Sequence, residues 1–225
     1  MATRVGVVLF PGSNCEHDAL RAVQLLGGNA EILWHRETDL SAYDAIIIPG
    51  GFAHGDYLRP GAIARFSPVM EAIARSAAGG LPVLGICNGF QVLCESHLLP
   101  GALQKNAGLS FICAPSVLEV ASSHSVLTQG VAVGTRLAVP INHFSGSYTC
   151  DDETLAELRD GERIVLRYVN NPNGSVDSIA GIANEAGNVV GLMPHPERAC
   201  DPLLGSEDGA VLLRAFLGAS APVLA

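Results

Sequence analysis

Apolar residues in the first half of the chain fall into short unbroken runs, separated by amphipathic segments of helical period. The runs are rich in β-branched residues and predict strands at residues 4–10, 30–34, 45–48 and 81–86. The segments between them predict helices at residues 16–26, 62–78 and 90–99, with Pro68 beginning the second part of the middle one. Such alternation predicts an α/β fold, in which an open, mostly parallel sheet carries helices on both faces.

The second half of the chain adds a strand-rich portion. Strand patterns cover residues 109–120, 163–169, 179–184 and 188–193, and a last helix is predicted at residues 208–217. The Asn-Pro-Asn-Gly string at residues 171–174 predicts a turn between two of these strands. Neither a repeat nor a linker interrupts the pattern, so one domain over residues 1–225 is predicted.

The strand pattern also indicates where a ligand would bind. In open parallel sheets, ligands lie outside the carboxyl ends of the strands, which points to the loops at residues 11–15, 49–56 and 87–89. In the first loop, Ser13 and Glu16 have the spacing of a capping box, which predicts that Ser13 caps the following helix. That helix is expected to end at Gly27.

Charge and hydropathy narrow the class of partner. The chain has 13 basic and 22 acidic residues and a net charge of −9, with the basic residues scattered, which argues against a nucleic-acid partner. Charged residues make up only 16% of the chain, which favours a surface partly covered by another protein. Because we find no signal peptide and no apolar run near the roughly 20 residues that span a bilayer, we expect a cytoplasmic protein without a membrane partner.

The six cysteines are expected to be free thiols rather than disulfides or metal ligands. No Cys-x-x-Cys pair or Cys/His cluster has the spacing of a structural zinc site, and a chain of this size needs no disulfide to hold its core. Five of the six are expected to be inert. Among these, Cys15 follows a strand and opens a helix, but it lacks flanking glycines.

Cys87 is the exception. The string Gly85-Ile86-Cys87-Asn88-Gly89 lies between a predicted strand and a predicted helix, and it has the form of a nucleophile elbow with cysteine in place of serine. Flanking glycines let the backbone turn sharply without a Cβ clash, and the helix N-terminus favours a thiolate. Cys87 is therefore the predicted nucleophile.

A base and its orienting group follow near the end of the chain. In Met193-Pro194-His195-Pro196-Glu197, the prolines favour extended backbone, so His195 and Glu197 are expected on the same side. Glu197 would then fix the tautomer of His195, which serves as base for Cys87. A metal site on this pair would need a third ligand, and no residue at a suitable spacing indicates one, so no metal is expected. The other histidines that we considered, at positions 17, 35, 97 and 124, are expected to be structural.

Amide cleavage also needs donors for the oxygen of its tetrahedral intermediate. The backbone N–H of Asn88, directly after the nucleophile, is the first predicted donor. Gly51, in the Pro-Gly-Gly-Phe string at residues 49–52, is the second.

Taken together, these motifs resemble the class I, triad-type glutamine amidotransferases, in which Pro-Gly-Gly, Gly-x-Cys-x-Gly and His-Pro-Glu occur in this order. The resemblance runs from about residue 4 to residue 198. It is closest to members that supply ammonia in de novo purine synthesis, as judged from the longer strings that begin at Phe10, Trp34, Pro49, Gly85 and Gly191.

This resemblance implies a flavodoxin-like glutaminase domain. Cys87, His195 and Glu197 would hydrolyse L-glutamine through a glutamyl thioester, with Gln91 and Phe52 binding the substrate. Ammonia would pass to a large synthetase subunit that aminates formylglycinamide ribonucleotide, often with a small third subunit. The chain has no Gly-x-x-x-x-Gly-Lys-Ser/Thr loop, so no cofactor is expected here, and ATP and Mg²⁺ would bind to the partner.

Two strings depart from the family pattern. Ala53-His54 stands where Ser-Tyr is usual, and His143-Phe144-Ser145-Gly146 replaces His-Gly-Glu-Gly, which removes a carboxylate and adds a ring. Details of glutamine binding or docking stay open at this point. Three alternatives also stay open: the glutaminase of a different amidotransferase, a non-catalytic glutamine-sensing module, and a cysteine peptidase or thioesterase.

Overall fold

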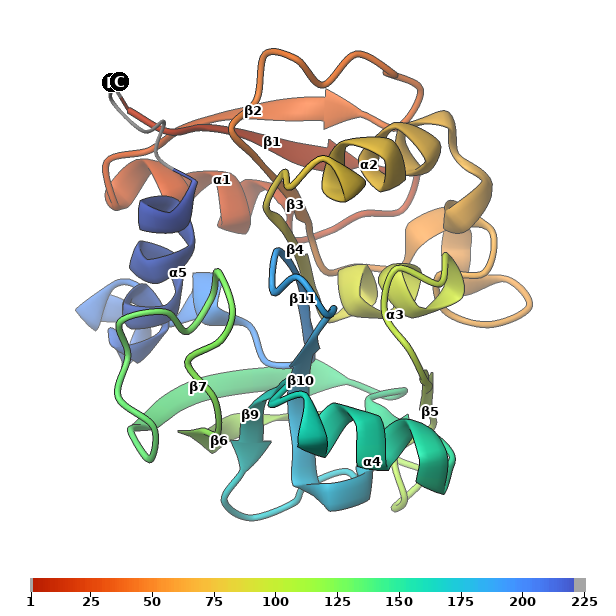
Figure 1. Ribbon diagram of the computed structural model, residues 1–225, viewed down its shortest axis with the longest axis vertical. Helices are drawn as coiled ribbons and strands as arrows, with labels where there is room; N and C mark the ends of the chain where they lie inside the picture. Colours follow the sequence, from red (N-terminus) through yellow and green to blue (C-terminus); the bar gives the residue numbers. More distant parts are fainter. Residues whose placement is uncertain (1, 221–225) are drawn as a thin grey trace.

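A single nine-stranded sheet runs through the computed structural model, which describes residues 2–220 (Figure 1). Its strand order is β2-β1-β3-β4-β11-β10-β9-β6-β7. The strands from β2 to β11 in this order are parallel, and each strand beyond β11 is antiparallel to its neighbour. The predicted fold class is confirmed, including the strand-rich portion from the second half of the chain.

The parallel half consists of short strands. Their bounds are β1 Arg4–Leu9, β2 Asn29–Trp34, β3 Ala45–Ile48, β4 Val83–Ile86 and β11 Val189–Leu192. In β3, β4 and β11 every residue is buried, which is why each reads as an unbroken apolar run.

In the antiparallel half, β6 and β7 are longer and partly exposed, whereas β9 and β10 are short and largely buried. Their bounds are β6 Ile112–Val120, β7 Arg136–His143, β9 Ile164–Tyr168 and β10 Ile179–Ala183. A separate two-stranded sheet pairs β5 Ala102–Gln104 with β8 Ser147–Thr149. Although β7 lies at the far edge of the sheet, the His195 N–H donates to Pro140 O of β7 at 2.8 Å. The sheet therefore curls until its last strand meets the segment that follows β11.

Helices cover both faces of the parallel strands. The α-helices are α1 Glu16–Leu25, α2 Pro68–Ala78, α3 Asn88–Glu95, α4 Asp152–Asp160 and α5 Asp208–Ala219. Short 3₁₀ helices are η1 Ala53–Asp56, η2 Ala64–Phe66, η3 Val176–Ser178, η4 Pro196–Arg198 and η5 Pro202–Leu204. Figure 1 shows α1 and α5 on one side of these strands and α2 and α3 on the other. None of the helices within residues 2–220 is long and apolar enough to cross a membrane.

The capping-box prediction is wrong. Helix α1 begins at Glu16 with Cys15 as its N-cap residue and no side-chain cap. The Ser13 hydroxyl instead accepts a hydrogen bond from the Phe10 N–H at 3.1 Å, because residue 13 belongs to the turn that follows β1 and pairs with Gly51. This turn carries Cys15 towards the carboxyl ends of the strands.

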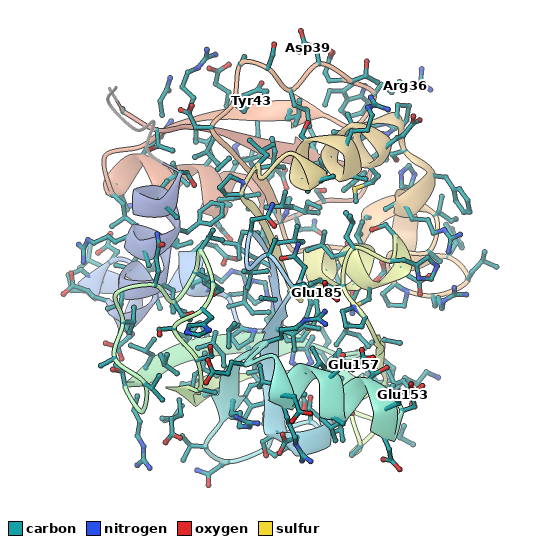
Figure 2. The ribbon with its side chains drawn as sticks, in the orientation of Figure 1. Arg36, Asp39, Tyr43, Glu153, Glu157 and Glu185 are labelled. Atoms are coloured by element: carbon teal, nitrogen blue, oxygen red, sulfur yellow. The ribbon has the colours of Figure 1, made fainter. Side chains whose placement is uncertain are left out.

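Two longer elements, β7 and α4, were not predicted. Helix α4 is mostly polar and buries only one residue fully, Leu158, so its apolar stripe is weak. Figure 2 shows Glu153 and Glu157 on this helix, at the opposite end of the molecule from Asp39 beside β2. The predicted helix at residues 90–99 also ends early, at Glu95, where a turn follows.

Candidate active site

The nucleophile elbow forms where β4 meets α3. Cys87 has φ 52° and ψ −104°, a strained conformation for a residue with a side chain. A Cβ at Gly89 would lie well inside contact distance of the backbone oxygen of Ile48, and one at Gly85 would meet Leu93 and Gly89. The elbow string therefore needs both glycines to pack β4, β3 and α3 this closely, as the sequence predicts.

A buried imidazole–carboxylate pair follows β11. His195 Nδ1 lies 2.6 Å from Glu197 Oε1, and each side chain is 1% exposed. Because a carboxylate only accepts, the proton of this hydrogen bond belongs on Nδ1 when the ring is neutral, which leaves Nε2 as the basic nitrogen. Nε2 is buried and has no partner among residues 2–220. The expected side-by-side arrangement of the two residues is present.

Burial and charge act in opposite directions on the imidazole. Burial alone would lower the pKa of His195, but the Glu197 carboxylate and the Cys87 sulfur raise this pKa well above the usual histidine value. The ring is therefore suited to hold a proton beside the sulfur and to release it to a departing group.

Two backbone N–H groups are the predicted donors for the oxyanion. Asn88 is the first residue of α3, so its N–H has no acceptor within the helix. Around Gly51, the pairing bonds run from Asn14 N–H to Gly50 O and from Phe52 N–H to Gly12 O, which leaves the Gly51 N–H outside that pairing. Gly51 lies in the loop after β3, and Asn88 opens α3 at the carboxyl end of β4.

A cavity of about 320 Å³ opens over these loops. Its wall includes the predicted residues Cys87, His195, Gly51, Gln91 and Phe52. Gln91 is 6% exposed, whereas half of the Phe52 surface faces solvent. The volume lies at the lower end of the range for ligand pockets, about 300–1,000 Å³, and suits a small molecule.

The opposite wall of the cavity comes from the end of β7 and the loop after it. Asn142, His143 and Ser145 line this side, and Asn142 O accepts a weak hydrogen bond from Cys87 Sγ at 3.8 Å. His143 is 3% exposed and its Nδ1 lies 3.0 Å from Asn106 Oδ1. Burial and the nearby His195 lower the pKa of His143 to about 4, so its ring is neutral near pH 7. His143 Nε2 is buried and has no hydrogen-bond partner in the described part of the chain.

Known proteins resemble this chain in sequence and fold. The family pattern of the CobB/CobQ-like glutamine amidotransferase domain matches residues 2–208. The chain belongs to the glutamine amidotransferase family.

Individual relatives are similar over nearly their whole length. A protein of Rubrobacter xylanophilus named phosphoribosylformylglycinamidine synthase subunit PurQ is 56% identical over 214 residues, which is 95% of this amidotransferase and 97% of the relative. A protein of the same name from Parasynechococcus marenigrum is 55% identical over 95% and 99% of the two chains.

Solved structures show the same fold. A chain in the structure of PurLQS from Thermotoga maritima has a TM-score of 0.90 and 42% identity, and the match covers 97% of this amidotransferase and 99% of that chain. Another glutamine amidotransferase from T. maritima has a TM-score of 0.63 at 18% identity, which shows the fold alone.

Cys15 lies closer to the candidate site of this amidotransferase than the sequence indicated. It is buried in the cavity wall, and its Sγ accepts a hydrogen bond from Arg198 Nη2 at 3.1 Å. Cys15 Sγ, a nitrogen of His195 and an oxygen of Glu197 all lie within 4.8 Å of one another, so the third ligand that the sequence did not indicate is present.

The distance between His195 and Glu197 nevertheless fits a hydrogen bond better than two ligands of one metal ion. His195 Nδ1 and Glu197 Oε1 are 2.6 Å apart, whereas two ligands of one tetrahedral zinc ion lie about 3.3 Å apart. The Arg198 guanidinium already places a positive charge at Cys15 Sγ.

Several cavity residues were not among the predicted site residues, and His143 and Asp56 are two of them. His143 ends strand β7, whose alternating Leu137, Val139 and Ile141 could have revealed it, but Pro140 interrupts that pattern. Asp56 stands in the string from residue 49 to residue 59 that carries the resemblance, and nothing in its spacing marks it as a binding residue.

Proposed function

We propose that this chain is the glutaminase subunit of phosphoribosylformylglycinamidine synthase, and that residues 1–225 form one glutaminase domain. The observation that carries the proposal is the buried His195–Glu197 hydrogen bond beside the strained Cys87, in a cavity of the size of an amino acid. The similarity to proteins of this name over 95% of the chain supports the choice of acceptor pathway.

The positions of the groups support the following reaction. The Cys87 sulfur attacks the side-chain amide carbon of L-glutamine, and the N–H groups of Asn88 and Gly51 stabilise the oxyanion that forms. His195 gives its proton to the leaving nitrogen, so ammonia departs and a glutamyl thioester remains. His195 then takes a proton from water, which attacks the thioester and releases glutamate and the thiol. Glu197 keeps the His195 ring in the orientation for both transfers.

Gln91 and Phe52 complete the proposed site. Gln91 stands one helical turn beyond Cys87 on α3, where its amide can bind the amino-acid part of the substrate. Phe52 supplies an apolar edge to the mouth of the cavity.

Ammonia would leave this subunit for a partner. We propose a large synthetase subunit that binds ATP and Mg²⁺ and converts formylglycinamide ribonucleotide to formylglycinamidine ribonucleotide, with a small third subunit in the assembly. The match to a chain of the PurLQS structure supports such an assembly. The six free cysteines fit a reducing compartment, and we propose the cytoplasm.

Glutamate and ammonia release from glutamine tests the proposal. Wild type and Cys87→Ser would each be assayed with and without the synthetase subunit, alongside product formation from added ammonia. We expect partner-stimulated release by wild type and at least a 1,000-fold loss in the variant, while ammonia-dependent product formation persists.

The controls separate the competing functions. Loss of ammonia-dependent activity in Cys87→Ser would assign Cys87 a structural or docking role. Turnover of peptides or thioesters without glutamine would favour a peptidase or thioesterase. Wild type that binds glutamine but never releases glutamate would favour a sensing module.

A further inference from the structure

Asp56 places a carboxylate in the cavity wall without a charged partner. It ends the 3₁₀ helix η1, is partly buried and lines the same cavity as Cys87. No Lys, Arg or His of residues 2–220 forms a salt bridge with Asp56. Removing a carboxylate from water costs free energy, which hydrogen bonds offset in part and a cationic ligand would offset further.

A hydrogen-bond network holds Asp56 beside the nucleophile helix. The Asn88 side-chain amide donates to Asp56 Oδ1 at 3.1 Å and to Gln91 Oε1 at 2.8 Å, and it accepts from the Ala53 N–H at 2.9 Å. Gln91 in turn donates to Ser145 O at 2.5 Å. Both N–H groups of the Asn88 amide and one of the two on Gln91 are thus engaged, whereas Asp56 Oδ1, Gln91 Oε1 and Ser145 O each accept one of these bonds and keep a lone pair for another. Such a surplus of acceptors suits a ligand group with several N–H donors.

The length of glutamine brings its amino group to this network. An amide carbon held at Cys87 is four bonds from the α-nitrogen, about 5 Å in an extended chain. Gln91 stands four residues beyond Cys87, about 6 Å along the axis of α3. The α-nitrogen of a substrate that lies along α3 therefore reaches the level of Gln91 and its neighbour Asp56.

We propose that Asp56 binds the α-ammonium group of glutamine and so selects a free α-amino acid over amides that lack this group. The assignment rests on the proposed glutaminase function. The oxygens of Gln91 and Ser145 accept the remaining ammonium hydrogens. Asp56 is thereby a specificity-determining residue, and it does not take part in the proton transfers at Cys87.

The ionisation of Asp56 supplies a test that needs no variant. Burial raises the pKa of Asp56 to about 6, against the opposing hydrogen bonds from Asn88 and from the backbone of Gly61. The carboxylate is therefore charged at pH 8 and largely neutral at pH 5, where it should bind an ammonium group poorly. The other titratable or charged side chains of the cavity wall are Cys15, Cys87, His143, His195 and Arg198.

The experiment compares glutamine with 4-carbamoylbutanoate, which is glutamine without its α-amino group. In the complex with the synthetase subunit, KM for glutamine and the competitive Ki of the analogue would be measured for wild type and Asp56→Asn. We expect KM to rise about 10- to 100-fold in the variant and Ki to change less than twofold. Asp39→Asn makes the same chemical change on the exposed surface beside β2 (Figure 2), and neither constant should move.

Wild type alone gives the second measurement. Because both ligands occupy the same cavity, effects that the other cavity groups have on both ligands cancel in the ratio of KM to Ki, and this ratio should rise as the pH falls from 8 to 5. Equal effects of Asp56→Asn on both ligands, or a ratio that does not change with pH, would overturn the assignment and make Asp56 a structural residue of the loop. Those results would leave the glutaminase function intact, whereas no glutamate release by wild type would overturn both.

Discussion

The two halves of the sheet contribute differently to the candidate site. The parallel strands β1, β3, β4 and β11 end at the cavity, and the loops after them carry Cys15, Gly51, Cys87 and His195. The antiparallel strands approach the cavity mainly through the end of β7, which places His143 and Asn142 on the opposite wall, with Phe111 just before β6 beside them. The parallel half of the sheet thus supplies the atoms proposed to react, and the antiparallel half closes the space around them.

This difference reflects how each half is held together. Parallel strands are buried on both faces, so their ends converge at one edge of the sheet without further support. β7 instead needs the curl of the sheet and specific bonds to reach the cavity. Asp208 Oδ2 accepts from the Ala138 N–H at 2.7 Å, and the Ser206 hydroxyl donates to Ala138 O at 2.8 Å. We therefore expect changes in the parallel half to affect chemistry, and changes at β7 to affect ligand binding and stability.

The largest effect is expected within the pair after β11. His195→Asn should lower kcat for glutamine hydrolysis about 10⁴-fold or more, because it removes the group that moves the proton. Glu197→Gln should cost about 10- to 100-fold less than that, because Glu197 only orients the ring. Steady-state assays of the complex check both values, with ammonia-dependent synthesis as the control. Equal losses in the two variants would contradict this division of roles.

His143, at the end of β7, should make the stability of the folded chain depend on pH. Its pKa is about 4 in the folded chain and near 6.5 when unfolded, so the unfolded state binds the proton first. The neutral His143 ring stabilises the folded state fully above pH 6.5, and this stabilisation is lost as the pH falls to 4. The free energy of unfolding should fall by about 3 kcal/mol over this range. Denaturant titrations of wild type and His143→Gln should therefore converge as the pH falls. A difference that is constant with pH would contradict this account.

Sequence reasoning reached the parallel half more completely than the antiparallel one, for a physical reason. A strand buried on both faces appears in the sequence as a short, unbroken apolar run, as at residues 45–48. The bounds predicted for that strand are confirmed. Cys87 and His195 follow strands of this kind and carry local motifs. Strand β7 is half-exposed and contains Pro140, so its pattern resembles a loop, and the packing that brings His143 to the cavity joins distant residues.

Gly146 tests how tightly the β7 wall is packed. A Cβ at this position would lie well inside contact distance of the His143 ring, which Asn106 holds in place. Gly146→Ala should therefore displace the ring or the adjacent Ser145, raise KM for glutamine about tenfold and cost about 1–3 kcal/mol of stability. Kinetics and thermal unfolding measure the two effects.

The matched control for this substitution lies in α5. A Cβ at Gly218 meets nothing within 4 Å, so Gly218→Ala should leave KM unchanged and stabilise the helix by up to about 1 kcal/mol. If KM rises equally in both variants, the effect of Gly146→Ala does not come from a clash with the His143 ring.

The smallest effect is expected at α4, in the antiparallel half and outside the cavity wall. The Asp151 side chain caps this helix by accepting from the Thr154 N–H at 2.8 Å, and the residue is exposed. Asp151→Ala should cost about 1 kcal/mol of stability through the lost cap, with Asp151→Asn retaining most of it. Because α4 lines no part of the cavity, kcat and KM should stay within twofold of wild type in both variants. A kinetic loss that follows the loss of stability would mean that the antiparallel half transmits strain to the reacting groups, and the two halves would then be one cooperative unit.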